Sequence, residues 1–248
     1  MDSPDNWRGQ PFLMYNLLMK ATWLFTRIVF FICLPVLIFT VTIGLAFNSL
    51  SLYKYGFKKY NISSVTGIAP EELNKAARGL ITYWGNGQEL IDITVIKDGA
   101  PFILFNEQEV IHLKDVKTLV KLDHYALAVT GLYVLAYLAF MLGGKTPRHR
   151  REAALAGMGG SLFSLGILAA LGIAVGLDFD GFWWQFHLLS FANDFWLLDP
   201  TKDYLVMMFP EGFWFDSVMI IAGVSTALTI FSGGLSWATL KRNPPCKS

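Results

Sequence analysis

The chain has 248 residues, of which 54% are hydrophobic and only 16% are charged, and its formal net charge is +1. This composition is too apolar for an ordinary soluble domain and indicates an integral membrane protein, and the sequence has no basic, aromatic-rich patch of the nucleic-acid-binding type. Cys33 falls in the first apolar run and Cys246 near the last residues. The two thiols are therefore expected at different depths and unpaired.

The first 50 residues predict an entry into the membrane. Residues 1–27 are expected to be cytoplasmic, with a short helix from Pro11 to Arg27 lying in the interface or, alternatively, a linker there. Residues 28–50 form an apolar run of spanning length, so we predict the first transmembrane helix in this range.

Residues 51–124 are polar, with nine basic and nine acidic side chains, and are long enough to fold by themselves. Pro70 followed by two glutamates predicts a helix with proline at its first position. The alternating residues Leu90 to Ile96, the turn signal Asp98-Gly99 and a returning segment at 101–105 predict a hairpin. The insertion is therefore expected to be a small α+β cap.

Three more apolar runs follow the cap and predict transmembrane helices at 125–142, 153–177 and 217–240. The polar segments that separate or follow them are a basic loop at 143–152, an aromatic and acidic segment at 178–216, and a tail at 241–248. The predicted fold class is an all-α membrane protein. It is a four-transmembrane-helix bundle with a small α+β extracytoplasmic cap inserted between the first and second spans.

The distribution of loop charges predicts the orientation. Lys145, Arg148, Arg150 and Arg151 make the 143–152 loop basic, and positive loops stay in the cytoplasm. Four spans then place both termini in the cytoplasm as well, in agreement with the basic residues that flank the outer ends of the bundle: Lys20, Arg27, Lys241, Arg242 and Lys247. The cap and the 178–216 segment must then share the opposite side.

The stretch from Asn106 to Asp123 carries the most distinctive chemistry of the cap. Asn106 and Glu109 have the spacing of a capping box, so a helix is expected to begin here and to run on toward the second span. We interpret Glu109 as a structural capping residue. His112 and Asp115 lie three residues apart and hence on one face, where Asp115 is placed to orient the His112 ring. The alternative for Asp115 is an exposed charge that pairs with a nearby lysine.

The second histidine of interest is His187, which lies among aromatic and acidic residues in the 178–216 segment. Taken alone, the aromatics suit a belt at the headgroup level. A belt does not need an imidazole, however, and burial among apolar groups lowers the pKa of a histidine and keeps it neutral, as a general base requires. We interpret His124 as an interfacial anchor and His149 as a solvated loop residue. Lys202 suits either a contact with an anionic oxygen or plain exposure.

Other catalytic patterns are missing from the sequence. It has no G-x-S-x-G elbow, and its glycine-rich third span lacks the residues of a phosphate-binding loop. A metal site formed by His112, Asp115 and His187 is conceivable, but H-x-x-D is a weak pattern for it and no metal or other cofactor is expected. The chemistry left is acid and base catalysis by histidines.

The string from Phe105 to Val120 resembles the E-x-x-H-x-x-D-V motif of the lipoprotein intramolecular transacylase family, whose members are four-span bacterial membrane proteins. The F-H pair at Phe186 and His187 and the L-x-x-x-F-P string at Leu205 to Pro210 are similar to the second marked region of that family. The resemblance covers nearly the whole chain in order and topology.

The resemblance implies an enzyme of the bacterial cytoplasmic membrane with its active site at the outer leaflet. Its substrate is a diacylated lipoprotein, whose N-terminal cysteine carries a diacylglyceryl thioether. The enzyme moves the sn-2 acyl chain to the cysteine α-amino group, which leaves a lyso-lipoprotein. The catalytic residues are expected to be His112, oriented by Asp115, and His187, as base and as acid or oxyanion donor in either order.

Two other functions fit the same residues. One is a non-enzymatic membrane protein that presents its outer cap to an envelope partner and needs neither histidine. The other is a lipid ester hydrolase in which the histidines activate water. A transporter is disfavoured, because the predicted spans carry almost no ionisable residue.

Overall fold

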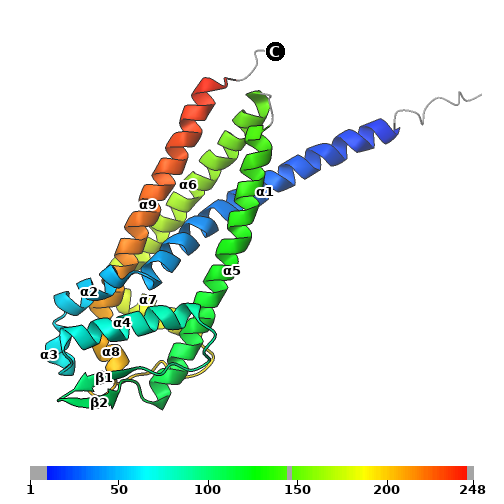
Figure 1. Ribbon diagram of the computed structural model, residues 1–248. Coiled ribbons are helices and arrows are strands. Elements are labelled where there is room, and N and C mark those ends of the chain that lie inside the picture. The colour runs from blue at the N-terminus through cyan, green and yellow to red at the C-terminus, as the bar shows by residue number, and fades with distance from the viewer. Residues whose placement is uncertain (1–9, 144–146, 245–248) are drawn as a thin grey trace, which may run out of the picture. The chain divides into compact units, whose positions relative to one another are not determined.

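The computed structural model describes residues 10–143 and 147–244, and most of them are helical (Figure 1). Within these ranges, four helices are long and apolar enough to cross a membrane. They are α1 (Gln10–Phe47), α5 (Glu107–Gly143), α6 (Pro147–Leu177) and α9 (Glu211–Arg242). The predicted four-helix membrane architecture is confirmed. Lys145, Cys246 and Lys247, on which part of the predicted topology and thiol chemistry depends, lie outside the described residues.

Two of the differences between the helix ends and the predicted boundaries change the interpretation of a segment. Helix α1 runs without a break past Arg27, so the expected interfacial helix and the first span are parts of one element. Helix α6 already begins at Pro147, which places His149 in a helix, where its ring stacks on Trp23 with centroids 5.4 Å apart. The prediction that His149 is a solvated loop residue is wrong, because an indole ring covers one face of its imidazole.

The cap contains the helix and the hairpin that the sequence predicts. The short elements outside the four long helices are α2 (Leu50–Lys59), α3 (Ile62–Thr66), α4 (Pro70–Gly85), β1 (Thr94–Lys97), β2 (Ala100–Ile103), α7 (Phe179–Ser190) and α8 (Tyr204–Met208). Pro70 opens α4 as expected. Asp98 and Gly99, with φ of 52° and 78°, form the two-residue turn between the antiparallel strands, since both positions need the left-handed conformation of a tight hairpin.

The contacts divide the chain into two compact units. The first contains residues 1–37, 129–166 and 228–248, and its helices meet through small residues and polar pairs. A Cβ on Gly160 would lie 2.9 Å from Leu34 Cδ2, the Ser161 and Ser232 hydroxyls are 2.8 Å apart, and Arg27 pairs with Glu152 at 2.8 Å.

The second unit contains residues 38–128 and 167–227 and therefore holds the cap, α7 and α8. One continuous apolar core joins its elements. Among its most buried members are Leu73 and Leu80 of α4, Val95 of β1, Leu113 of α5, Met208 of α8 and Phe213 of α9. This core holds the two polar segments of the sequence together.

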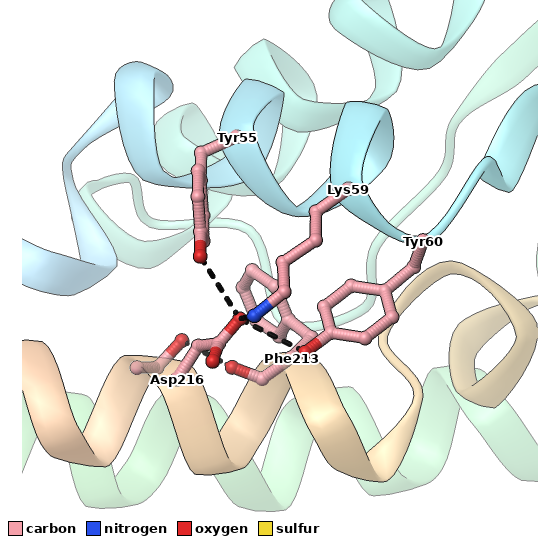
Figure 2. A network of polar contacts seen from close by, with 6 residues as sticks. Tyr55, Lys59, Tyr60, Phe213 and Asp216 are labelled. Atoms are coloured by element: carbon pink, nitrogen blue, oxygen red, sulfur yellow. Dashed lines mark hydrogen bonds and ion pairs between the residues drawn. The ribbon is translucent and has the colours of Figure 1, made fainter.

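A polar network fastens α2 to the start of α9, as Figure 2 shows. The Lys59 ammonium and the hydroxyls of Tyr55 and Tyr60 all donate to Asp216 Oδ2, at 2.6, 3.2 and 2.9 Å. Beneath the network, Gly56 packs so closely on the Phe213 ring that a Cβ would overlap it. The close approach requires glycine at this position.

Helix α5 connects the cap to a membrane span. Its 37 residues extend about 55 Å, whereas the hydrocarbon core of a bilayer is about 30 Å thick. The helix therefore does not fit within the bilayer over its whole length. The charged side chains of α5 are all in its first half, up to residue 124.

Candidate functional site

The start of α5 is held in place by a complete capping box. The Asn106 amide donates to Glu109 Oε2 at 2.7 Å, and the Glu109 amide donates to Asn106 Oδ1 at 3.1 Å. The other carboxylate oxygen of Glu109 accepts the Leu205 amide at 2.6 Å. Glu109 is therefore a structural residue, as predicted, and it also joins α5 to α8. His112 follows one turn later along the helix.

The structure brings the two predicted histidines together. His112 on α5 and His187 on α7 have ring centroids 6.1 Å apart, with an angle of 29° between the ring planes. Both side chains are buried, at 7% and 8% relative exposure. Residues 75 positions apart in the sequence thus form one buried imidazole pair.

Aromatic side chains surround this pair. Phe191 packs on both rings, with centroids 5.0 Å from His112 and 5.6 Å from His187. Trp183 and Trp196 each lie 4.8 Å from the His187 ring. The aromatics that suited a membrane belt in the sequence therefore include three that line the histidine site.

Burial sets the charge state of both rings. The pKa of His112 is lowered to about 4, chiefly by desolvation and also by the nearby His187, while the Asp115 carboxylate opposes the change. Burial also lowers the pKa of His187, against the opposing effect of its hydrogen bond to Trp183. Both rings are therefore neutral near pH 7, which is the state that a base needs.

The tautomer of neutral His187 follows from one contact. His187 Nδ1 lies 2.8 Å from the Trp183 carbonyl oxygen, and because a carbonyl only accepts, Nδ1 carries the proton. The lone pair of the neutral ring is then on Nε2. His112 differs, since its Nδ1 is buried without a hydrogen-bond partner among the described residues.

Asp115 holds a loop in place, and its carboxylate does not bond the His112 ring. Asp115 Oδ2 accepts the Asn193 side-chain amide at 2.9 Å, and Asn193 Oδ1 in turn accepts the Phe195 amide. The expectation that Asp115 orients His112 directly finds no hydrogen bond in the described part of the chain. The lysine alternative is not seen for Lys114 and Lys117, which bind Glu89 and the Asn86–Gln88 turn.

The loop that Asp115 holds is the connection between α7 and α8, which carries Phe191 and Trp196. Gln108 Nε2 donates to the Leu197 carbonyl at 3.0 Å and to the Phe195 carbonyl at 3.4 Å. Helix α5 therefore binds this loop through Gln108 as well as through Asp115. The sequence reasoning missed Asn193 and Gln108. An asparagine within an aromatic segment is the only signal that marked the first of them.

The remaining sequence candidates lie elsewhere. His124 is half-buried two turns or more beyond Asp115 on α5, and Lys202 is exposed beside α8. Within residues 10–143 and 147–244, no group of three His, Cys, Asp or Glu side chains is arranged to hold a metal ion. The histidine pair is accordingly the centre of the candidate site.

The chain is similar to the proteins of one known family. The model of the family described as lipoprotein intramolecular transacylase Lit matches residues 28–214. The solved Lit transacylase of Bacillus cereus is 20% identical, with a TM-score of 0.73 over 90% of this chain and 98% of that one. A variant of the Bacillus protein with arginine in place of a histidine is 21% identical, with a TM-score of 0.71 over 92% and 97% of the two chains. A search of curated proteins finds no match.

Proposed function

Because the chain belongs to the lipoprotein intramolecular transacylase family, we propose that its reaction takes place at the pair formed by His112 and His187. The protein is a lipoprotein intramolecular transacylase with a multi-pass membrane fold. The residue assignment rests on one observation. The imidazoles of His112 and His187, one from each of the two sequence motifs, are buried side by side.

The reaction transfers an acyl chain from oxygen to nitrogen within one molecule. The cysteine α-amino nitrogen attacks the carbonyl carbon of the sn-2 ester, and a tetrahedral oxyanion forms. The carbon–oxygen bond to glycerol then breaks, an amide bond remains, and the proton lost by the amine ends on the glycerol oxygen. The α-amino group is mostly protonated near neutral pH, with a pKa of about 7.7–8.0 in peptides, so the attack needs a base.

We assign the base to His187. Its Nε2 holds the lone pair, because Nδ1–H is bound to the Trp183 carbonyl, and the same bond stabilises the ring once Nε2 takes the amine proton. His112 has no comparable contact that fixes one tautomer. We assign to it the complementary task of stabilising the developing oxyanion through a hydrogen bond from its N–H, while protonated His187 passes the amine proton on to the leaving glycerol oxygen.

The surroundings of the pair favour transfer over hydrolysis. Phe191, Trp183 and Trp196 cover the two rings, and a site closed by aromatic groups leaves little room for an attacking water. The nucleophile and the ester belong to one molecule, so holding them together replaces an encounter between two reactants. The family reaction therefore needs only a positioned base and a positioned donor.

We further propose the orientation that the charges predict. Arg148, Arg150 and Arg151 at the start of α6 lie on the cytoplasmic side, with both termini, and the histidine pair lies at the outer leaflet of a bacterial cytoplasmic membrane. The acidic 178–216 segment and the cap then face outward, toward the headgroups of the lipid-anchored substrate. Membrane lipids are the other partners of this surface.

The test is mass spectrometry of the N-terminal lipopeptide of a reporter lipoprotein, co-expressed with this protein in a bacterium that lacks N-acylation. Wild type should yield a peptide of unchanged mass with one acyl chain on nitrogen. His112→Gln and His187→Gln should each abolish the transfer while the protein stays folded in the membrane. His124→Gln is the matched control, since His124 lies on the same helix outside the pair.

Three outcomes would overturn the assignment. Near-normal transfer in both histidine variants would place the chemistry elsewhere. Loss of one acyl chain from the peptide would indicate a hydrolase. A diacyl peptide with a free amine in the presence of wild type would favour a binding protein.

A further inference from the structure

One edge of the cap hairpin has no hydrogen-bond partner within residues 10–143 and 147–244. The strands pair so that Val95 faces Phe102 and Thr94 faces Ile103, and the Leu104 amide donates to the Ile93 carbonyl. In an antiparallel ladder bonded and non-bonded pairs alternate, so Thr94 and Ile103 form a non-bonded pair. The N–H and carbonyl of Ile103 and the carbonyl of Pro101 therefore point away from β1.

The other edge of the hairpin is occupied. The Ile96 amide, which points away from β2, donates to Glu72 Oε2 at 2.7 Å, and Lys75 pairs with the same oxygen at 3.3 Å. Helix α4 thus covers β1. Pro101 in β2 agrees with an edge position, because proline removes a ladder donor and is tolerated only there. The edge available to an incoming strand is that of β2.

A cavity of about 360 Å³ lies along this open edge. Residues 102–106 line it, together with Glu109, Lys202 and Tyr204. Ile103, which lies in this lining, is 69% exposed. Glu109 precedes His112 by three residues on α5, so the cavity begins one helical turn from the histidine pair.

We propose that this edge binds the polypeptide of the substrate, namely the residues that follow the lipidated cysteine, as an extended strand added to β2. The inference rests on the proposed function, which places the lipidated cysteine at His112 and His187. The rest of the lipoprotein chain must then leave the site toward water, and we place its path along the cavity lined by Glu109 and Ile103. About six residues suffice, at about 3.3 Å per extended residue, to pass Glu109 and follow the four residues of β2.

Recognition through the main chain suits this substrate class. Lipoproteins share a lipidated cysteine and a polypeptide, but not a particular side chain beyond it, and strand addition draws its affinity from backbone hydrogen bonds. The Ile103 N–H and the two outward carbonyls offer those bonds without reading sequence. The exposed apolar side chain of Ile103 adds contact with whichever residue lies opposite.

The experiment measures kcat/KM for transacylation of synthetic diacylglyceryl-cysteine peptides that carry one, three, six or ten residues after the cysteine, with full-length protein in detergent. For wild type, kcat/KM should rise about tenfold between one and six residues and then level off. Six-residue peptides with N-methylated backbone amides facing β2 should lose most of that gain.

Ile103→Pro removes the outward N–H and leaves the bonded pairs of the hairpin intact. It should abolish the dependence on peptide length and leave kcat/KM for the one-residue peptide unchanged. Thr94→Pro is the matched control, because it makes the same change at the cross-strand position on the covered edge, and it should keep the length dependence.

The outcomes separate this inference from the proposed function. Conversion of every peptide with a kcat/KM that is independent of length would overturn strand addition while leaving the transacylase intact. No conversion of any peptide by wild type would count against the function itself. If Ile103→Pro fails to fold, the N-methylated peptides on wild type decide, and an unchanged kcat/KM with them overturns the inference.

Discussion

Exchanging Asn193 for aspartate should disable the site by loosening the loop that packs on the histidine pair. The Asn193 side-chain amide donates to Asp115 Oδ2 at 2.9 Å and so ties the loop that carries Phe191 and Trp196 to the helix that carries His112. Asn193→Asp keeps the size of the side chain but replaces the donating amide nitrogen with an oxygen. It also places a second carboxylate next to the carboxylate of Asp115. The loop should move away from α5, taking its aromatic rings from the histidine pair.

The size of the effect follows from the geometry. A hydrogen bond to a charged group contributes about 1.5–3 kcal/mol, and both residues are half-buried, so Asn193→Ala should cost about 1.5 kcal/mol, or about tenfold in activity. Two unit charges 2.9 Å apart repel by about 6 kcal/mol at an effective dielectric constant of about 20. Loop movement relieves much of that repulsion. Asn193→Asp should nevertheless be at least about tenfold less active than Asn193→Ala at pH 7.5.

The assay is the initial rate of acyl transfer on a fixed lipopeptide, with the thermal midpoint measured in parallel. The decisive variant is Asp115→Asn combined with Asn193→Asp, which exchanges donor and acceptor and restores one hydrogen bond between the same positions. The double variant should recover activity to within about threefold of wild type. Equal activity of Asn193→Asp and Asn193→Ala, or no recovery in the double variant, would refute the assignment of this bond as what holds the loop.

Three further predictions concern stability. Gly56→Ala should lower the free energy of unfolding by about 1–3 kcal/mol, because its Cβ would overlap the Phe213 ring, whereas Gly85→Ala, which meets nothing within 4 Å, should not; thermal melts compare the two. The pKa of His112 falls from 6.5 to about 4 on folding. Between these two pH values the unfolded chain therefore binds one proton more at this residue than the folded chain does. The free energy of unfolding accordingly decreases as the pH falls through this range, by about 1.4 kcal/mol per pH unit. A His112→Gln variant should lose less stability than wild type between pH 7 and pH 5, and equal losses would contradict the buried neutral ring. Glu109→Gln should destabilise the cap by about 2–4 kcal/mol, since its carboxylate accepts backbone amides from two segments and an amide has one acceptor oxygen; unchanged protection of those amides in hydrogen exchange would refute this.

The features that the sequence predicted correctly are local ones. The capping box of Asn106 and Glu109 depends on a spacing of three residues, and the Asp98-Gly99 turn on two residues that tolerate positive φ. Pro70 marks a helix start because its ring cannot fit the interior of one. The apolar runs that identified the four long helices are also local features, because the bilayer thickness sets the length of each spanning segment separately.

The sequence singled out His112 and His187, by motif and by their apolar neighbours, and the structure places the two rings side by side, which no sequence pattern predicts. The 6.1 Å contact between His112 and His187 arises from packing between α5 and α7, which are far apart in the chain. A pattern along the chain reports which residues share a helix face, and it contains no distance between two helices. The hydrogen bond between Asp115 and Asn193 also escapes sequence patterns, because the two residues lie far apart in the chain.

The amino-acid sequence by itself determined the elements of this protein, its membrane class and, through two short motifs, its family. Only the tertiary structure decided that Asn193 binds Asp115, that Trp183 fixes the tautomer of His187, and that the outer edge of β2 is open while that of β1 is covered. Secondary structure is set by interactions over a few residues, whereas a site depends on which side chains the folded core brings within hydrogen-bonding distance.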